Sequence, residues 1–273
     1  MSTFEMTIRP RKGWQAVDFA EAFHYRELLA FLVWRDIKIR YRQTLLGGLW
    51  AVLQPLIAMV IFTFVFNRLA GVKSDGPPYP LFAFAGLAPW TFFSTALSQS
   101  SNSLVTNQQL VSKVYFPRIF IPIGAVAALL MDLFFSMCLL GVLMIYYHWP
   151  LTIHALLVPV FMLGAVLSAC GLGLILSALN VSFRDVKYAV PFMIQMGIFL
   201  TPVIYPIRYI PARWQVLMGL NPMAGVVLGF RYSLLGTNVM WQVLALSMVV
   251  SAVLFVVGLY TFRRMERRFA DVI

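Results

Sequence analysis

Side chains that could carry out acid–base, nucleophilic or metal chemistry are few in this sequence and lie far apart. The histidines are His24, His148 and His154, and the two cysteines, Cys138 and Cys170, lie inside apolar runs. A zinc site or a catalytic site needs such groups at short, defined spacing or gathered around one nucleophile. The sequence has no such grouping and no G-x-x-x-x-G-K-[ST] phosphate-binding loop. We therefore expect a chain without catalytic residues, a metal or a cofactor, which is not an enzyme and hydrolyses no ATP itself.

Charged residues as a whole are scarce. The 273 residues are 61% hydrophobic and 11% charged, and the mean hydropathy is +0.83. Soluble domains carry about 25% charged residues, so this chain has too few polar groups to cover a surface in water. Backbone groups in lipid must be hydrogen-bonded within the chain, which favours helices. The composition therefore predicts an all-α integral membrane protein.

Six apolar segments approach the length of about 20 residues that a membrane-crossing helix needs. They are Thr44–Asn67, Pro80–Leu104, Ile119–Tyr147, Ala155–Leu179, Ala189–Ile204 and Trp241–Phe262. The fifth is short and is interrupted by Pro202. The chain then divides into a cytoplasmic N-terminal segment (1–43), a six-helix transmembrane domain (44–262) and a basic tail (263–273).

The distribution of positive charge sets the orientation of these spans. With six spans, 16 of the 21 Lys and Arg residues fall on the side that holds both termini. The positive-inside rule places that side in the cytoplasm. A seventh span would put the basic tail outside, against the rule. The net charge of +11 is thus explained by membrane orientation, and we expect no nucleic-acid partner.

The segment Tyr205–Asn238 remains between the fifth and last spans, on the outer side. Asn221-Pro222 has the pattern of an N-cap followed by proline at the first helical position, and Gly236 suits a position just after a helix. We expect two short helices, Ala212–Leu220 and Pro222–Leu235, in a hairpin that is either re-entrant or lies on the surface.

The N-terminal segment has helical spacing of apolar residues over Trp14–Trp34, which predicts an amphipathic helix at the inner membrane interface. A basic run follows, with Asp36 as its one acid; its basic residues are Arg35, Lys38, Arg40 and Arg42. The ordinary interpretation is an anchor on lipid head groups before the first span.

Asp132 is a single carboxylate deep in the third span. Intramembrane acids are candidates for function, and a proton-coupled carrier would use one. A relay also needs a His or Glu partner, and the span offers none. We favour a structural hydrogen bond between helices or a place on the wall of a wet cavity, and keep the carrier as an alternative.

Five ordered stretches resemble one known family, the permease subunits of polysaccharide-exporting ABC transporters. The resemblance is strongest to the O-antigen exporters, with teichoic acid and capsule exporters near them. The stretches are RDIKIRYRQTLLGGLWAVLQPL (35–56), PWTFFSTALSQSSNSLVTNQQLVSKVYFPRIFIP (89–122), LSALNVSFRDVKYAVPF (176–192), TPVIYP (201–206) and LNPMAGVVLGFR (220–231).

The resemblance implies a homodimer in the bacterial inner membrane, with both termini cytoplasmic, working with two copies of a separate P-loop ATPase subunit. Its cargo would be a polysaccharide linked to a polyprenyl pyrophosphate. Spans one and five would line the channel, where aromatic faces suit the C–H surface of a sugar. The channel candidates are Trp50, Phe62, Phe66, Phe199 and Tyr205.

The resemblance also implies two further sets of residues. Basic residues at the inner mouth would contact the carrier pyrophosphate, and the candidates are Arg35, Lys38, Arg40, Arg42, Arg184 and Lys187. The N-terminal helix and a short helix in Asn107–Tyr115 would contact the ATPase. The candidates near the second of these are Gln108, Lys113, Tyr115, Phe116 and Arg118.

Two other functions stay open at this point. An ABC permease of the same architecture could carry a lipid or a small drug, and an integral-membrane transferase would need paired acids or a His/Asp site at one membrane face. The dispersed histidines and acids make the transferase the weaker of the two.

Overall fold

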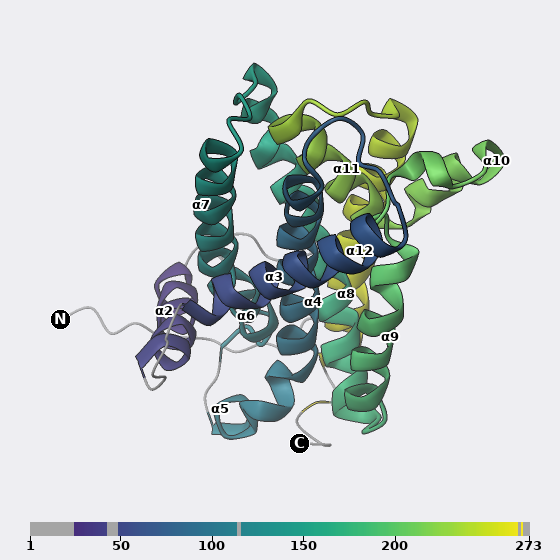
Figure 1. Ribbon diagram of the computed structural model, residues 1–273. Coiled ribbons are helices and arrows are strands. Elements are labelled where there is room, and N and C mark those ends of the chain that lie inside the picture. Colours follow the sequence, from purple (N-terminus) through teal and green to yellow (C-terminus); the bar gives the residue numbers. More distant parts are fainter. Residues whose placement is uncertain (1–24, 43–48, 114–115, 267–268, 270–273) are drawn as a thin grey trace.

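The computed structural model describes residues 25–42, 49–113, 116–266 and 269, and in these residues the ordered elements are helices, with no strand (Figure 1). Five segments are long and apolar enough to cross a membrane, by length and composition: Leu49–Leu69, Tyr79–Thr106, Phe120–Tyr146, Ile153–Ser182 and Trp241–Glu266. They coincide with the first four and the last of the predicted spans. The prediction of an all-α integral membrane protein is therefore confirmed.

Several of these spans are built from consecutive helices. The elements are α3 (Leu49–Phe62) with a π-helix (Thr63–Leu69), α4 (Tyr79–Thr106), α6 (Phe120–Ala128) with α7 (Leu130–Tyr146), a 3₁₀ turn (Ile153–Leu157) with α8 (Val158–Ser182), and α12 (Trp241–Glu266). The predicted fifth span corresponds to the shorter helix α9 (Val186–Leu200). Helix α9 ends before Pro202 because a proline disfavours helical geometry in the residue before it and cannot donate a backbone hydrogen bond.

The centre of the bundle is formed by α4, α8, α12 and α11 (Pro222–Leu235), which pack against one another. Small residues bring α8 and α12 together. A methyl group on Gly171 would lie 2.5 Å from the backbone carbonyl carbon of Leu254, and one on Gly258 would lie 2.4 Å from the carbonyl oxygen of Gly171. Close contact of this kind stabilises helix pairs in membranes, where apolar burial gives little driving force.

The hairpin before α12 has the two predicted helical parts. Its first part is α10 (Ala212–Gln215) followed by a 3₁₀ turn (Val216–Leu220), and its second part is α11. The Asn221 side chain accepts a hydrogen bond from the Met223 amide at 3.0 Å, and Gly236 has a left-handed φ of 67°. Both caps were predicted. The surface-lying alternative is wrong for α11, because 11 of its residues are buried in the bundle.

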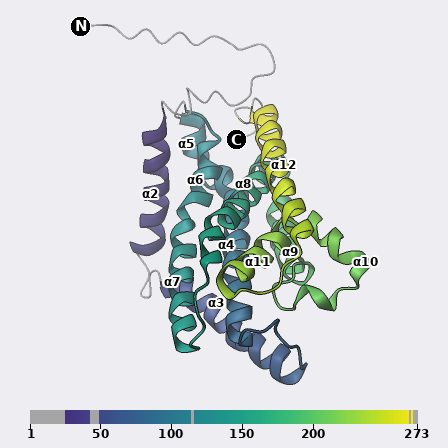
Figure 2. The same cartoon turned by 90° about the horizontal axis from the view of Figure 1, so that it is seen from above.

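Helix α2 spans Arg26–Arg42, so the predicted helix end at Trp34 is wrong. The basic run continues the helix, because Lys and Arg are good helix formers and a positive charge in the last turn interacts favourably with the helix dipole. The first part of the predicted helix, residues 14–24, lies outside the described residues. Helix α2 packs against α6 and lies at one side of the bundle (Figures 1 and 2).

The two ends of the bundle carry the segments that the charge distribution assigns to opposite membrane faces. Helix α5 (Gln108–Lys113) and the turn between α8 and α9 lie at one end, and α10 and α11 lie toward the other (Figure 1). Helix α5 lies within the short helix predicted for Asn107–Tyr115. Residue Tyr115 itself is outside the described residues.

Candidate functional site

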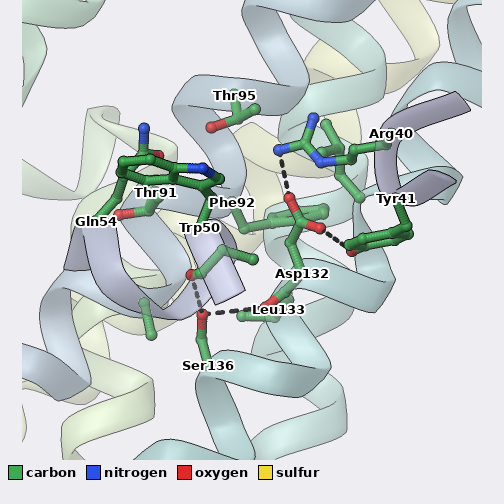
Figure 3. Close-up of a pocket in the computed structure, with 13 residues that line it drawn as sticks. Arg40, Tyr41, Trp50, Gln54, Thr91, Phe92, Thr95, Asp132, Leu133 and Ser136 are labelled. Carbon is green, nitrogen blue, oxygen red and sulfur yellow. Dashed lines mark hydrogen bonds and ion pairs between the residues drawn. The ribbon is translucent and has the colours of Figure 1, made fainter. Parts of the chain in front are cut away.

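The carboxylate of Asp132 is the centre of a polar cluster between α2 and α7. Asp132 lies in the first turn of α7, and its side chain is 13% exposed. One carboxylate oxygen is 2.5 Å from the Arg40 guanidinium, and the other accepts a hydrogen bond from the Tyr41 hydroxyl (Figure 3). Two consecutive residues of α2 therefore share one acceptor on α7.

The Tyr41 hydroxyl acts as a donor in this cluster. Burial raises the pKa of Tyr41 well above its ordinary value, and the hydrogen bond to Asp132 raises it further. The hydroxyl therefore stays protonated across the physiological range. The ionised carboxylate accepts hydrogen bonds from both the guanidinium and the hydroxyl group. Such charge-assisted hydrogen bonds are stronger than hydrogen bonds between neutral groups.

Ser136 lies one turn after Asp132 and connects α7 to α3. Its hydroxyl donates to the Asp132 carbonyl oxygen at 3.0 Å, and it also lies 3.4 Å from the Ala51 carbonyl oxygen. Helix α7 is thus linked to α2 by a charged side chain and to α3 by a weak neutral contact.

A cavity of about 210 Å³ lies beside this cluster, between α2, α3, α4 and α7. Its walls contain apolar, hydroxyl, amide and charged groups: Arg40, Tyr41, Trp50, Ala51, Gln54, Ala88, Thr91, Phe92, Thr95, Leu129, Asp132, Leu133 and Ser136 (Figure 3). This volume holds several waters or one group of the size of a sugar ring.

Three polar side chains on the cavity wall have hydrogen-bonding capacity to spare. Within the described residues, the side chains of Gln54, Thr91 and Thr95 form no hydrogen bond of their own. Trp50 lies beside them with 49% of its surface exposed. An aromatic face next to free hydroxyl and amide groups suits a polar, hydroxylated guest. The described residues contain no group of three His, Cys, Asp or Glu that could hold a metal.

The five channel candidates lie on α3, on the π-helix that follows it, on α9 and in the chain after α9. Trp50 and Phe199 are exposed, whereas Phe62 and Phe66 are half-buried and pack edge to face, with ring centres 5.7 Å apart. The hydroxyl of Tyr205 donates to the Phe199 carbonyl oxygen at 2.9 Å. Of the five, only Trp50 lies on the cavity wall.

The pyrophosphate candidates fall into two groups that the structure does not bring together. Four of them, Arg35, Lys38, Arg40 and Arg42, lie on α2. Arg184 lies in the turn before α9 and Lys187 in the first turn of α9. Helices α2 and α9 are on opposite sides of the bundle (Figures 1 and 2).

Partners within the chain further distinguish these basic residues. Arg35 pairs with Asp36 on its own helix at 2.8 Å, and Arg40 is occupied by Asp132. Lys187 lies 4.7 Å from the Tyr188 ring centre. Lys38, Arg42 and Arg184 are exposed.

Of the four ATPase-coupling candidates that the structure describes, two have exposed side chains and two are packed against the bundle. Gln108 and Lys113 of α5 are exposed. Phe116 is buried in a small apolar cluster with Phe262 and Phe269, and Arg118 donates to the Glu266 carbonyl oxygen at 3.2 Å. Phe116 and Arg118 therefore hold this segment to the end of α12, while α5 presents the surface.

Sequence reasoning missed several residues of the site. Tyr41, Gln54, Thr91, Thr95 and Ser136 line the cavity but were not singled out. Two signals were present: Gln54 is an amide inside an apolar span, and Thr91 and Thr95 are one helical turn apart. The link from Asp132 to α2 had no sequence signal, because 91 residues separate it from Tyr41.

Comparisons with known proteins agree along most of the chain. A model of the family described as ABC-2 type transporter matches residues 27–235. The O-antigen export system permease protein RfbA of Klebsiella pneumoniae is 30% identical over 251 residues, or 90% of this chain and 95% of that protein. The protein of the same name from Myxococcus xanthus is 35% identical over 214 residues, or 77% and 81%. The polysialic acid transport protein KpsM of Escherichia coli is 26% identical over 197 residues, or 71% and 75%.

Proposed function

Because this chain belongs to the ABC-2 type transporter family, we propose that it is the membrane-spanning subunit of an ATP-driven polysaccharide exporter. Its cargo is a glycan linked to a polyprenyl pyrophosphate, which it moves out of the cytoplasm across the bacterial inner membrane. The observation that carries this proposal is the similarity to an O-antigen export permease over 90% of the chain. The family match also includes α2 and α11, which lie outside the five long spans.

The membrane arrangement in this proposal has six crossings. Helix α9 supplies the fifth crossing together with the chain that follows it, and α11 is a re-entrant helix on the outer side. Both termini then lie in the cytoplasm, which keeps the basic tail inside in accordance with the positive-inside rule. A crossing by the 14-residue α11 as well would give seven crossings and put the basic tail outside.

The functional unit in this proposal is a homodimer whose channel is lined by α3 and α9. Two observations support this role for these helices. Pro55 and Met59 are the only buried residues of α3, and Val190 is the only one of α9. The outer face of α3 includes Trp50, and that of α9 includes Phe199. Such aromatic faces would allow a sugar chain to slide without tight hydrogen bonds.

The energy source in this proposal is a separate ATPase, because the sequence has no phosphate-binding loop. Two copies would bind at the cytoplasmic end, where α5 is exposed and α2 lies beside α6. The exposed basic residues of α2, of the α8–α9 turn and of the first turn of α9 would meet lipid head groups and the carrier pyrophosphate. The exposed members are Lys38, Arg42, Arg184 and Lys187.

Deletion of the gene in the source cell tests the proposed cargo. We expect surface polysaccharide to disappear while lipid-linked glycan accumulates in the inner membrane, and a plasmid copy should restore export. Unchanged surface polysaccharide would contradict the proposal. Altered efflux of a lipid or a small drug in the same strain would then support the alternative cargo of an ABC permease.

A further inference from the structure

We propose that Asp132 is a positioning residue that holds the end of α2 against the transmembrane bundle and thereby closes one wall of the cavity. Release of Arg40 and Tyr41 from Asp132 opens the cavity while the rest of the bundle stays packed. This inference concerns the chain itself and does not depend on the cargo or on the ATPase.

The first half of helix α2 has an apolar attachment to the bundle. Among the described elements, it packs mainly against α6, with Leu32 buried. A Cβ atom on Gly124 of α6 would lie 3.7 Å from the Cβ of Leu32 and 3.8 Å from a methyl group of Leu29. This packing holds the first half of α2. At the end of the helix, where Arg40 and Tyr41 lie, the Tyr41 ring packs edge to face against Phe135 of α7, with ring centres 6.2 Å apart, and polar groups supply further contacts.

The polar part of the attachment at this end depends on one side chain. Both Arg40 and Tyr41 bond to the Asp132 carboxylate. The loss of that one carboxylate therefore removes both bonds, whereas the loss of either partner leaves the other. The Asp132 side chain is 13% exposed and Arg40 is 31% exposed. Water can therefore reach the Arg40 guanidinium when the bond is broken. Release of Arg40 thus does not leave a buried charge without a partner.

The cavity lies beside this attachment, and α2, α3 and α4 share its wall. Arg40 and Tyr41 form the part of its wall that α2 contributes, and Trp50 and Gln54 form the part that α3 contributes. Thr95 lies on α4 on the same cavity (Figure 3). When the end of α2 moves away from α7, Arg40 and Tyr41 leave the wall and Thr95 becomes accessible from that side.

Thiol labelling in membrane vesicles measures this opening. The reporter is Thr95→Cys in a chain whose exposed Cys138 is replaced by Ser, and the probe is a water-soluble maleimide. The natural Cys170, which is 5% exposed in α8, stays in place as an internal control. Loosening of the whole bundle would label Cys170 too, whereas release of α2 alone would not.

We expect Asp132→Asn, which removes the negative charge and thereby weakens both bonds, to raise the labelling rate at position 95 at least fivefold and to leave Cys170 unlabelled. Tyr41→Phe, which removes one bond, should give a smaller increase. The exchange variant Arg40→Asp with Asp132→Arg should bring the rate back toward the parent value. Asp36→Asn breaks the Arg35–Asp36 pair on the same helix and should leave the rate unchanged.

Three results would overturn the inference. The first is a parent-like labelling rate in both Asp132→Asn and Tyr41→Phe. The second is an exchange variant that labels as fast as Asp132→Asn. The third is parallel labelling of Cys170, which would make Asp132 a general stabiliser of the bundle. If Asp132→Asn fails to accumulate in the membrane, Tyr41→Phe and the exchange variant still decide the question. None of these results bears on the proposed export function.

Discussion

The guanidinium of Arg231 in α11 lies 3.5 Å from the centre of the Phe82 ring in α4, and its Nε donates to the Phe82 carbonyl oxygen at 3.0 Å. The other two nitrogens donate to the carbonyl oxygens of Pro202, at 2.6 Å, and Val203. Arg231 is 1% exposed. One side chain thus joins α11, α4 and the chain after α9.

Space for this guanidinium comes from Gly86, because a methyl group there would lie 2.6 Å from an Arg231 nitrogen. A buried cation is costly unless its donors are all satisfied, and here backbone oxygens and an aromatic face provide the partners. Arg231 falls in Tyr205–Asn238, the segment that the charge distribution places on the outer side. Its side chain lies in the interior of the bundle.

Replacement of Arg231 by Leu should destabilise the protein strongly. Three buried carbonyl oxygens lose their partner, and each such loss costs roughly 1–3 kcal/mol. We expect a lowered melting temperature of the purified protein and less of it in the membrane. Arg213→Leu is the matched control, since Arg213 is exposed. Equal melting temperatures for the two variants would contradict this assignment.

The contact between α8 and α12 should not tolerate an added methyl group at Gly171. The methyl would overlap the Leu254 backbone, and overpacking of this kind costs about 1–3 kcal/mol. Gly141→Ala is the control because nothing lies within 4 Å of that position, and alanine favours a helix over glycine. We expect a lower melting temperature for Gly171→Ala only. A similar decrease in both variants would mean that helix packing is not the cause.

Trp50 should matter for export through its aromatic face. We expect Trp50→Ala to reduce the amount of polysaccharide exported about fivefold, the equivalent of about 1 kcal/mol of aromatic contact, and Trp50→Phe to retain most export. Phe134→Ala is the control, since Phe134 is 58% exposed on α7 but lies outside the cavity lining. The measurement is surface polysaccharide per permease in the membrane. A larger loss from Phe134→Ala than from Trp50→Ala would contradict the role of Trp50.

Lys113 should contribute to binding the ATPase at the cytoplasmic end. Reversal of an exposed charge in an interface mainly weakens association and its rate. We expect Lys113→Glu to reduce the ATPase recovered with the tagged chain several-fold. Lys73→Glu is the control because the charge distribution places Lys73 on the outer side. If Lys73→Glu reduces the amount of ATPase recovered and Lys113→Glu does not, the chain has the opposite orientation in the membrane.

Long apolar segments and helix caps could be predicted from sequence because both are local. The run of apolar residues determines a span, and Asn221 and Gly236 act on the backbone within a few residues. The end of α2 was misplaced because the basic run was interpreted only as a membrane anchor, although Lys and Arg also favour helix. A run of positive charge therefore indicates the side of the membrane, but it does not show where a helix ends.

The polar contacts of the site could not be predicted because their partners are distant in the chain. Asp132 was recognised as unusual, but its pairing with Arg40 needs the packing of α2 on α6, which no periodicity specifies. Arg231 gives the same lesson from another place in the fold: its partners Phe82 and Pro202 lie 149 and 29 residues away. In both cases the residue type was informative, and the partner was determined by helix packing.

The most direct test of the account is the mass of the complex that copurifies with the tagged chain from native membranes in mild detergent. The account predicts two copies of this chain with two copies of a P-loop ATPase. A chain that purifies reproducibly without any nucleotide-binding partner, while remaining folded and dimeric, would contradict an ATP-driven exporter.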